Sequence, residues 1–551
     1  MSSGERENMV ERSALTLLYE IASGSEIAAA CECGECVYSP KPSGYDLLLM
    51  IDDYADGLRY HTRRLNGRHV TILAADRSLV ELDARKGAMG EFILERLLTP
   101  YLTLVNGDLL RSIEVDAKER TVREELADLV LEYGEMAREL VIQREYLMLA
   151  RMRKRARVFL PAARACSLLL EPSVREENLR RMAPGYDSAI QRLITAGVIR
   201  KEGSTFVLEE SFVDRQLSRK PAGKVINVVE AGRRALQAYL AQGRAAYLTP
   251  DVLVREIAFS LERTLLMDVE STGLEDPKRY LSLKTTAEPV SLSERFSIES
   301  FAGKIRPGAV MTVSPLGNVL NEVYLITAGN ERLVAKKFTE WQGFKWFTLG
   351  LVSLGTRLFS VSGKARLENE YAFNRLLSRR GVRVPEILHV SLPDRVLVER
   401  YIEGSSLVEV VRKAVSSESL SDHDREVVYK VGSILARIHA SGVAIGDSKP
   451  ENFLCTRDDE VYSLDLEQAK KSGDKAWDVA EFLYYSGHYV FPTIPSGGLR
   501  EYINAFTTGY RESGDVDTLI KAAGVRYSRV FSLWTPPLAL HEIAKALRSI
   551  Q

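Results

Sequence analysis

The segment GDSKPENFL, residues 446–454, has the residue types and the spacing that phosphoryl transfer requires. Asp447 could orient an attacking hydroxyl group, and Lys449 two residues later could steady the transferred phosphate. Asn452, at the fifth position after the aspartate, could bind Mg²⁺. Asp465 follows 18 residues after Asp447, within YSLDLEQA, and is the second expected metal ligand. The pattern predicts a site for ATP and Mg²⁺ in which Asp447 and Lys449 are catalytic.

A short strand upstream, RLVAKKF, is expected to supply the lysine that binds the nucleotide phosphates. Alternation along a strand puts Ala335 and Lys337 on one face and Lys336 on the other. We therefore predict that Lys337, with Ala335, lines the nucleotide site. The amphipathic helix that follows, ARLENEYAFNRLLSRRG, offers a partner for the lysine, with Glu370 preferred and Glu368 as the second choice.

Two further segments are positioned to contact the nucleotide. The hairpin SPLGNVLNEVYLI is expected to cover the phosphates, with close backbone approach at Gly317, Asn318 and Asn321. A single glycine is a weak signal, since the usual G-x-G-x-x-G is absent. The segment RVLVERYIEGSSL predicts a strand and then a hinge that hydrogen-bonds adenine through its backbone, at Glu399, Arg400 and Tyr401.

In their order and spacing, these residues resemble the small atypical branch of protein-kinase-like proteins, similar to the RIO kinases and to the Bud32 kinase of the KEOPS complex. The resemblance covers residues 300–551 and implies a bilobal kinase fold that uses ATP and Mg²⁺. The sequence departs from the family pattern at two places. Ile445 and Gly446 replace the usual histidine-containing dipeptide before the catalytic aspartate, and Glu467 replaces the glycine after the metal-binding aspartate. The residues that match are Lys337, Glu370, Asp447, Asn452 and Asp465.

The segment after the metal-binding aspartate bears on the acceptor. Asp478, in AWDVAEFLYY, follows Asp465 by only 13 residues, and no A-P-E motif stands between them. A regulated protein kinase would have a longer activation segment, so a non-peptide acceptor is favoured. The architecture resembles archaeal RNA kinases related to Bud32, which phosphorylate a ribose 2′-hydroxyl of a variable-loop uridine in tRNA. This resemblance implies tRNA as the acceptor and an archaeal source. Two alternatives stay open, an atypical serine/threonine protein kinase and an ATP-binding scaffold with little turnover.

The chain of 551 residues is long enough for two to four domains, because single hydrophobic cores stop growing well below that length. The expected fold class is α+β and multidomain, with a bilobal protein-kinase-like domain at the C-terminus. The domain boundaries that we predict are an α/β domain at 1–130, a basic helix and a winged-helix domain at 131–222, a helical segment with a linker at 223–290, and the kinase-like domain at 291–551.

The first of these domains resembles a minimal nucleotidyltransferase, in which a Gly-Ser pair precedes a strand with two alternate carboxylates. In SGYDLLLMID, Asp46 is present but Leu48 stands in the second carboxylate's place, so a two-metal site would lack half of its ligands. The resemblance therefore implies an inactive domain. Cys31, Cys33 and Cys36 form CECGEC, which is either a partial zinc site or a turn with reduced thiols.

Nucleic-acid contact is predicted from charge and from element order. VREENLRRMA and GYDSAIQRLITAGVI have the pattern of two short helices, and a hairpin around Gly203 follows, which is the order of a winged helix. From residue 150 to residue 220 there are 15 Lys and Arg against 8 Asp and Glu, although the whole chain has a net charge of -1. A second basic cluster lies between Arg59 and His69. The candidates for RNA contact are Arg151, Arg153, Lys154, Arg155, Arg157, Arg192, Arg200 and Lys201.

Composition favours a soluble cytoplasmic protein. Hydrophobic residues make up 45% of the chain and charged residues 27%. No apolar run approaches the roughly 18 residues that a spanning helix needs, and the N-terminus is polar, unlike a secretory signal. We expect no membrane partner.

Overall fold

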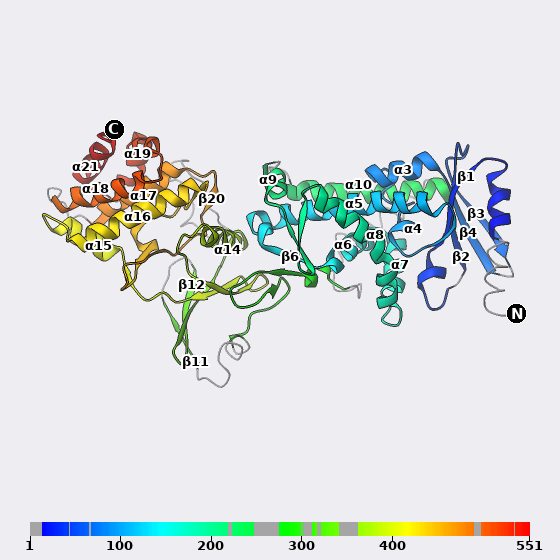
Figure 1. Ribbon diagram of the computed structural model, residues 1–551, viewed down its shortest axis with the longest axis horizontal. Helices are drawn as coiled ribbons and strands as arrows, with labels where there is room; N and C mark the ends of the chain where they lie inside the picture. The colour runs from blue at the N-terminus through cyan, green and yellow to red at the C-terminus, as the bar shows by residue number, and fades with distance from the viewer. Residues whose placement is uncertain are drawn as a thin grey trace. The chain divides into compact units, whose positions relative to one another are not determined.

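The computed structural model divides into two compact units, Met1–Leu281 and Ser282–Gln551, each of which contains helices and sheets (Figure 1). The expected α+β class is confirmed at this level, while the boundaries predicted inside the first unit stay predictions. The residues that the structure describes are 14–42, 44–65, 68–218, 223–246, 275–298, 301, 311–316, 321–340, 362–489, 497–533 and 535–550.

The first unit contains a five-stranded sheet in the order β3-β4-β2-β1-β5, with β2 parallel to β4 and the other pairs antiparallel. Its central strand is apolar on both sides because both faces are covered. Leu47 and Leu49 pack on one face with helical residues 14–22, and Leu48 and Met50 pack on the other face with longer helices. The strands are β1 (Ile27–Cys33), β2 (Tyr45–Ile51), β3 (Leu58–Leu65), β4 (Arg68–Asp76) and β5 (Leu102–Val105).

The helices of this unit have clear local causes. Helix α3 begins where the Asp76 carboxylate accepts a hydrogen bond from Ser78 N–H, and it ends at Gly87, whose φ of 61° suits glycine. Helix α5 runs for 27 residues and packs Leu110 and Ile113 against the sheet. The elements are α2 (Glu35–Tyr38), α3 (Arg77–Lys86), α4 (Glu95–Leu98), α5 (Gly107–Tyr133), η1 (Gly134–Glu139), α10 (Gly223–Ala246) and η3 (Pro277–Tyr280).

The predicted hairpin is confirmed, since β7 pairs with β8 around Gly203. The prediction of two short helices before it is wrong, because α8 continues through Pro184 as one helix. Its buried face, which includes Tyr186 and Ala189, packs along α5, and this packing outweighs the helix bond that proline removes. The order of elements is β6 (Leu140–Ile142), α6 (Arg144–Val158), α7 (Leu160–Leu169), α8 (Arg175–Thr195), β7 (Ile199–Glu202), β8 (Thr205–Leu208) and α9 (Glu210–Ser218).

The second unit has a small lobe built on an antiparallel sheet in the order β11-β12-β13-β15-β14. Ile326, Leu333 and Val398 form an apolar cluster on one face of this sheet. Strand β9 (Leu281–Leu283) begins at the last residue of the first unit and pairs with β10 (Val290–Ser291); neither strand belongs to this sheet. The elements of the small lobe are β11 (Met311–Pro315), β12 (Glu322–Ala328), β13 (Glu331–Lys337), α14 (Gly363–Arg379), β14 (Ile387–Ser391) and β15 (Val396–Arg400).

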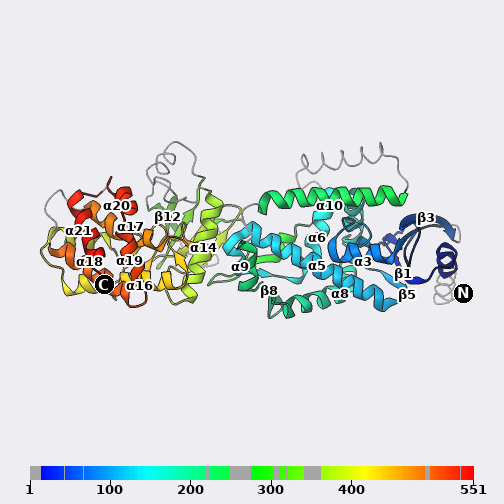
Figure 2. The same ribbon diagram turned by 90° about the horizontal axis from the view of Figure 1, so that it is seen from above.

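The large lobe of this unit is mainly helical, and Figure 2 shows its helices grouped together. Helices α16 and α18 pack closely because a Cβ at Gly432 or Gly509 would clash with the other helix's backbone. No helix among the described residues is both long and apolar enough to span a bilayer. The elements are α15 (Val408–Ser416), α16 (Asp422–Ala440), α17 (Lys475–Ser486), α18 (Gly497–Arg511), α19 (Val516–Ala522), α20 (Val525–Phe531), α21 (Pro537–Arg548), β16 (Ser405–Ser406), β17 (Val443–Ala444), η4 (Pro450–Asn452), β18 (Phe453–Cys455), β19 (Val461–Ser463), β20 (Lys470–Lys471) and η5 (Gly487–Tyr489).

Candidate active site

A largely buried lysine near the end of β13 joins three elements of the second unit. Lys336 Nζ lies 2.8 Å from Glu370 Oε1 on α14 and 2.9 Å from Glu399 Oε1 on β15. It also donates a hydrogen bond to the backbone oxygen of Leu464, at 3.0 Å. Burial opposes its charge, but the neighbouring carboxylates, Glu370 first among them, raise the pKa of Lys336 well above its usual value. The ammonium group is therefore charged and held in one position.

Glu370 connects this lysine to the segment that carries Asp465. Its second carboxylate oxygen accepts a hydrogen bond from the backbone N–H of Leu466, at 2.6 Å. Because Leu464 and Leu466 flank Asp465, the lysine and the glutamate together hold the backbone on both sides of that aspartate. Burial raises the pKa of Asp465, and the charge of Lys336 opposes the rise.

The predicted catalytic loop brings Asp447, Lys449 and Asn452 together. Lys449 Nζ is 2.8 Å from Asp447 Oδ2, and the Asn452 side-chain amide donates to the Asp447 backbone oxygen at 2.8 Å. The backbone N–H of Leu464 donates to the backbone oxygen of Asn452 at 2.9 Å, which places the loop beside the strand that leads to Asp465. Burial opposes the charge of Lys449, but Asp447 raises the pKa of this lysine above its usual value.

Asn452 and Asp465 offer oxygen atoms that fit Mg²⁺. The amide nitrogen of Asn452 is bound to the loop backbone, so its side-chain oxygen is the atom left for a cation. Besides burial, the charge of Asp447 raises the pKa of Asp465, a repulsion that a divalent cation would relieve. Mg²⁺ usually takes one or two protein carboxylates and completes its shell with water and phosphate. The described residues contain no group of three or more His, Cys, Asp or Glu able to hold a metal.

Comparisons with known proteins cover this part of the chain. A family model described as "Phosphotransferase enzyme family" (APH) matches residues 312–485, a range that contains every side chain of the cluster above. This part of the second unit is therefore similar to kinase-like phosphotransferases. The KEOPS complex subunit Bud32 of Pyrococcus abyssi (strain GE5 / Orsay) is 30% identical over 113 residues, which cover 20% of this chain and 49% of that protein. The chain thus spans about half the length of the curated relative that it matches.

In the second unit, the lysine that meets Glu370 is Lys336, so the predicted choice of Lys337 is wrong. Lys337 is half exposed, and its Nζ lies 3.1 Å from Glu322 Oε2. Ala335 is buried in the apolar cluster of the small lobe, on the face of β13 opposite Lys336, and does not line the nucleotide site as predicted. The alternation along the strand was assigned correctly, but the other face of the strand meets α14.

The residues predicted for the hinge lie at the end of β15 with other partners. The Glu399 carboxylate pairs with Lys336 instead of leading into the hinge. The backbone N–H of Arg400 donates to the backbone oxygen of Glu386 at 2.9 Å, and the backbone N–H of Tyr401 donates to the backbone oxygen of Arg332 at 3.1 Å. Both of these N–H groups are used by the sheet, so neither is available to adenine.

Sequence reasoning missed an arginine that joins three parts of the site. Arg366, on α14, is fully buried, with Nη1 3.1 Å from Glu467 Oε2 and 2.6 Å from Asn321 Oδ1. Asn321 Nδ2 donates to Glu467 Oε2 at 2.7 Å, and the backbone oxygen of Thr339 accepts a further bond from the guanidinium. We call Arg366, Glu467 and Asn321 the arginine triad. The available signal was spacing, because Arg366 stands one helical turn before Glu370.

The arginine triad changes two sequence-based expectations. Glu467, which replaces a glycine of the family pattern, supplies the acidic partner of a buried cation. Asn321, predicted to approach the phosphates through its backbone, uses its side chain to connect the start of β12 with the segment after Asp465. Gly317 and Asn318, predicted to approach the phosphates as well, lie outside the described residues.

The predicted catalytic loop is anchored by the carboxylate of Asp478 on α17. Its two carboxylate oxygens accept hydrogen bonds from the backbone N–H groups of Ile445 and Gly446, at 2.6 and 2.7 Å. His439 Nε2 lies 3.0 Å from the same carboxylate. The histidine that usually precedes Asp447 is missing here, yet a histidine from α16 reaches the carboxylate that anchors the loop.

Three arginines predicted to contact RNA are buried in the first unit. Arg151, Arg153 and Arg155 have exposed fractions of 4%, 9% and 8%, so this prediction is wrong for them. A buried cation is costly unless a carboxylate pairs with it, and α6 inserts its basic face among such partners. These partners are Glu91, Glu95, Glu124, Glu125 and Asp276.

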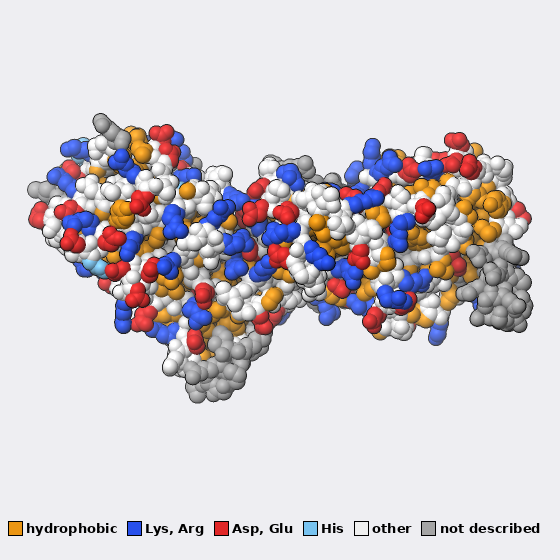
Figure 3. Space-filling view, in the orientation of Figure 1, with side chains coloured by type: hydrophobic (Ala, Val, Ile, Leu, Met, Phe, Trp, Pro, Cys, Tyr) orange, Lys and Arg blue, Asp and Glu red, His pale blue; other side chains and the backbone are white. Residues whose placement is uncertain are grey.

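The other RNA-contact candidates reach the surface. Lys154, Arg192 and Arg200 each form an ion pair with a carboxylate of the same unit. Arg157 and Lys201 have exposed side chains. On the face drawn in Figure 3, basic and acidic side chains are interspersed and form no continuous basic stripe.

The basic cluster between residues 59 and 69 is more open. Arg59 pairs with Asp56 at 2.9 Å. Arg63 and Arg64, on β3, are exposed, and no carboxylate of the described residues forms a salt bridge with them. Arg68, on β4, is also exposed and lies over the Tyr45 ring. We call Arg63, Arg64 and Arg68 the basic hairpin.

The cysteine cluster lies at the end of β1. Cys31 and Cys33 are buried, and the Cys36 thiol donates to the Cys33 backbone oxygen at 2.9 Å. Burial raises the pKa of Cys36, so this thiol stays protonated. The described residues, CECGEC included, hold no metal-binding group of three or more ligands. Asp46 is the neighbouring residue on β2, and Leu48 is buried in the sheet.

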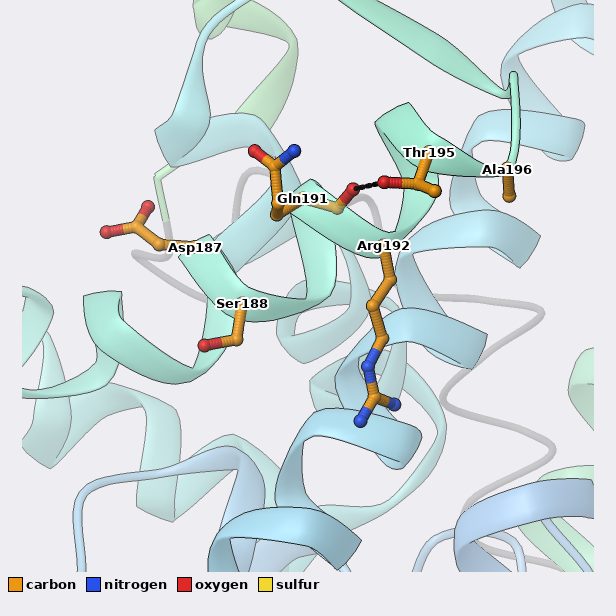
Figure 4. A pocket seen from close by; sticks show the side chains of 6 residues that line it. All are labelled: Asp187, Ser188, Gln191, Arg192, Thr195 and Ala196. Carbon is orange, nitrogen blue, oxygen red and sulfur yellow. Dashed lines mark hydrogen bonds between the residues drawn. The ribbon is translucent and has the colours of Figure 1, made fainter.

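A surface hollow of about 690 Å³ runs along α8 (Figure 4). Thr195 Oγ1 donates to the Gln191 backbone oxygen at 3.0 Å, and Arg192 is bound to Asp116. The hollow is lined by Asp187, Ser188, Gln191, Arg192, Thr195 and Ala196.

Proposed function

We propose that this protein is an ATP-dependent kinase that transfers the γ-phosphate to a ribose 2′-hydroxyl of tRNA in the cytoplasm. Phosphoryl transfer depends mainly on electrostatic positioning, and the small and large lobes both contribute charged groups to one cluster. This observation carries the proposal: the convergence of Lys336, Glu370, Asp447, Asn452 and Asp465.

Each side chain has a defined part in the reaction. Asp447 accepts the proton of the acceptor hydroxyl group, and the oxygen of that hydroxyl group forms a bond to the γ-phosphorus. The bond from that phosphorus to the bridging oxygen breaks, and ADP leaves. Lys449, 2.8 Å from Asp447, stabilises the transferred phosphate, and Lys336 stabilises the phosphates that stay on ADP. Asn452 and Asp465 would hold Mg²⁺, which neutralises phosphate charge when bound.

Two features support RNA as the acceptor. After Asp465, the chain forms β20, which pairs with β17, and it enters α17 at Lys475. This fully described stretch has no long segment of the kind on which protein kinases dock a peptide. The basic hairpin of the first unit supplies exposed cations that suit a phosphate backbone. The resemblance to archaeal RNA kinases adds tRNA as the specific acceptor.

The proposal is tested with γ-labelled ATP, bulk tRNA and total protein in one reaction. We expect label in tRNA, and we expect Asp447→Asn to lower its rate by roughly 100-fold or more, as loss of a general base does. Alkaline cleavage of RNA needs a free 2′-hydroxyl, so a labelled 2′-phosphate would be recovered in an alkali-resistant dinucleotide. Asp422→Asn, a fully exposed aspartate of the same domain, is the matched control.

The other outcomes identify the alternatives. Label only in polypeptide would contradict the proposal and support an atypical serine/threonine protein kinase. Tight ATP binding without transfer to either acceptor would support the scaffold. Label in tRNA that alkali releases as single nucleotides would place the phosphate on another hydroxyl.

A further inference from the structure

An aromatic cluster lies on the surface of the kinase-like domain, at the C-terminal end of α17. The ring centroids of His488 and Tyr489 are 5.5 Å apart with planes at 74°, and those of Tyr485 and His488 are 5.7 Å apart with planes at 33°. His488 is exposed, and both tyrosines are partly exposed. Three rings that remain in contact with solvent offer flat apolar surface outside the lobe's core.

This cluster lies beside the catalytic loop. The Tyr489 hydroxyl donates a hydrogen bond to the carboxylate of Glu451, which is two residues after Lys449. Burial raises the pKa of Tyr485, and the charges of Glu451, Lys449 and Asp447 also shift it. The Tyr485 phenol therefore lies within electrostatic reach of both catalytic side chains.

A guanidinium group completes the surface. Arg412, exposed on α15, places its Cζ 5.6 Å from the centroid of the Tyr489 ring. Helix α15 packs against η4 of the catalytic loop and against η5, so the arginine and the rings belong to one local structure. We call Tyr485, His488, Tyr489 and Arg412 the aromatic shelf. Aromatic faces and arginine planes are the groups on which unstacked bases are held.

We infer that the aromatic shelf binds an unpaired base of the acceptor RNA by stacking, which holds a neighbouring ribose hydroxyl near Asp447. The inference rests on the proposed function and adds to it how the acceptor is recognised. Stacking suits any base because every base has a π face, so the shelf selects for an accessible unpaired nucleotide more than for its identity. The charge of Arg412 also suits the phosphate attached to such a nucleotide.

The test measures the KM for bulk tRNA and the KM for ATP in the full chain. We expect the double variant Arg412→Ala/His488→Ala to raise the KM for tRNA by roughly 5- to 100-fold, the effect of losing one stacked base. The KM for ATP should stay within about twofold of the wild-type value, because no shelf residue contacts Lys336, Glu370 or Glu399. His488→Phe keeps a flat ring and should retain most of the affinity.

A matched control exists in the same domain. The Arg526 guanidinium lies 5.6 Å from the Tyr527 ring, away from the shelf on α20, so Arg526→Ala removes an equivalent arginine and should leave the KM for tRNA unchanged. If the double variant still labels tRNA and its KM for tRNA is unchanged, the stacking role of the aromatic shelf is wrong but the proposed function stands. If the wild-type protein labels only polypeptide, the proposed function is wrong, and so is the inference that the aromatic shelf binds RNA.

Discussion

Lys336 and Lys337 are neighbours in the chain but have opposite surroundings. The side chain of Lys336 is 14% exposed and contacts Glu370 and Glu399, whereas that of Lys337 is 50% exposed and contacts Glu322. We predict that Lys336→Met lowers kcat/KM for ATP by roughly 100- to 1000-fold, because a fixed cation on the phosphates is lost. Lys337→Met should change it by no more than about twofold, since an exposed ion pair contributes little. Steady-state kinetics on both variants measures the difference.

Folding has to be separated from chemistry in this test. Lys336→Met leaves two carboxylates buried without their cation, which should cost about 3–5 kcal/mol of the free energy of unfolding. Lys336→Arg keeps a positive charge there and should restore stability without restoring full activity, since a guanidinium does not match an ammonium site. An active Lys336→Met protein beside an inactive Lys337→Met protein would reverse our assignment.

The two lysines also show which parts of the candidate site could be predicted from the sequence. The order and spacing of Asp447, Asn452 and Asp465 sufficed to predict that they belong to one site, because loop chemistry of this kind depends on local spacing. Alternation along β13 was predictable for the same reason. Which face of β13 meets α14 was not, because it depends on the apolar cluster that buries Ala335, and that cluster involves residues far apart in the sequence.

At the scale of elements, the arginine triad ties α14, the start of β12 and the segment after Asp465 together. Arg366 is fully buried, so removing it leaves Glu467 without its cation. We predict that Arg366→Met lowers the free energy of unfolding by about 3–5 kcal/mol and lowers kcat, because three parts of the site lose a common contact. Chemical denaturation and steady-state kinetics measure the two effects.

Two further variants show whether burial is the cause. The double variant Arg366→Met/Glu467→Leu leaves no buried unpaired charge and should recover part of the lost stability. Arg395 forms an exposed pair with Glu340 at 2.6 Å in the same lobe, so Arg395→Met should cost no more than about 1 kcal/mol. Equal losses for Arg366→Met and Arg395→Met would rule out the special role given to the arginine triad.

Elements were predictable where local signals agree with packing. The β7–β8 hairpin has a turn at Gly203, whose φ of 62° suits glycine, and its prediction was confirmed. The region of helix α8 was predicted as two short helices, which lie on either side of Pro184. One continuous face, which includes Tyr186, is nevertheless buried along α5, and only the folded structure shows that partner. The arginine triad could not be predicted for the same reason, since its three residues are far apart in the sequence and meet only in the folded structure.

At the scale of the whole molecule, charge in the sequence and charge on the surface differ. The run from Arg151 to Arg157 is the densest basic stretch of its region, yet most of it is buried among carboxylates of the first unit. Only the basic cations that remain exposed and unneutralised can release counterions from a nucleic acid. By this criterion we expect the basic hairpin, not α6, to supply the nucleic-acid contact of the first unit.

The last prediction follows from this difference. Arg63→Ala/Arg64→Ala should weaken tRNA binding and reduce the slope of log K against log salt by about 1.4–1.8, since each phosphate contact contributes about 0.7–0.9. Arg123→Ala/Arg180→Ala removes two exposed arginines of the same unit that already pair with Glu119 and Glu177, and it should leave the slope unchanged. Filter binding over a salt series measures both.

Arg151→Ala separates a structural from a binding role. Because this side chain is 5% exposed and pairs with Glu91 and Glu125, its loss should lower the thermal stability of the first unit while the folded protein keeps its salt slope. If Arg151→Ala melts normally but binds tRNA with a smaller salt slope, then α6 does contact the RNA. An unchanged slope in Arg63→Ala/Arg64→Ala would exclude the basic hairpin, because phosphate contacts cannot be lost without a change in counterion release.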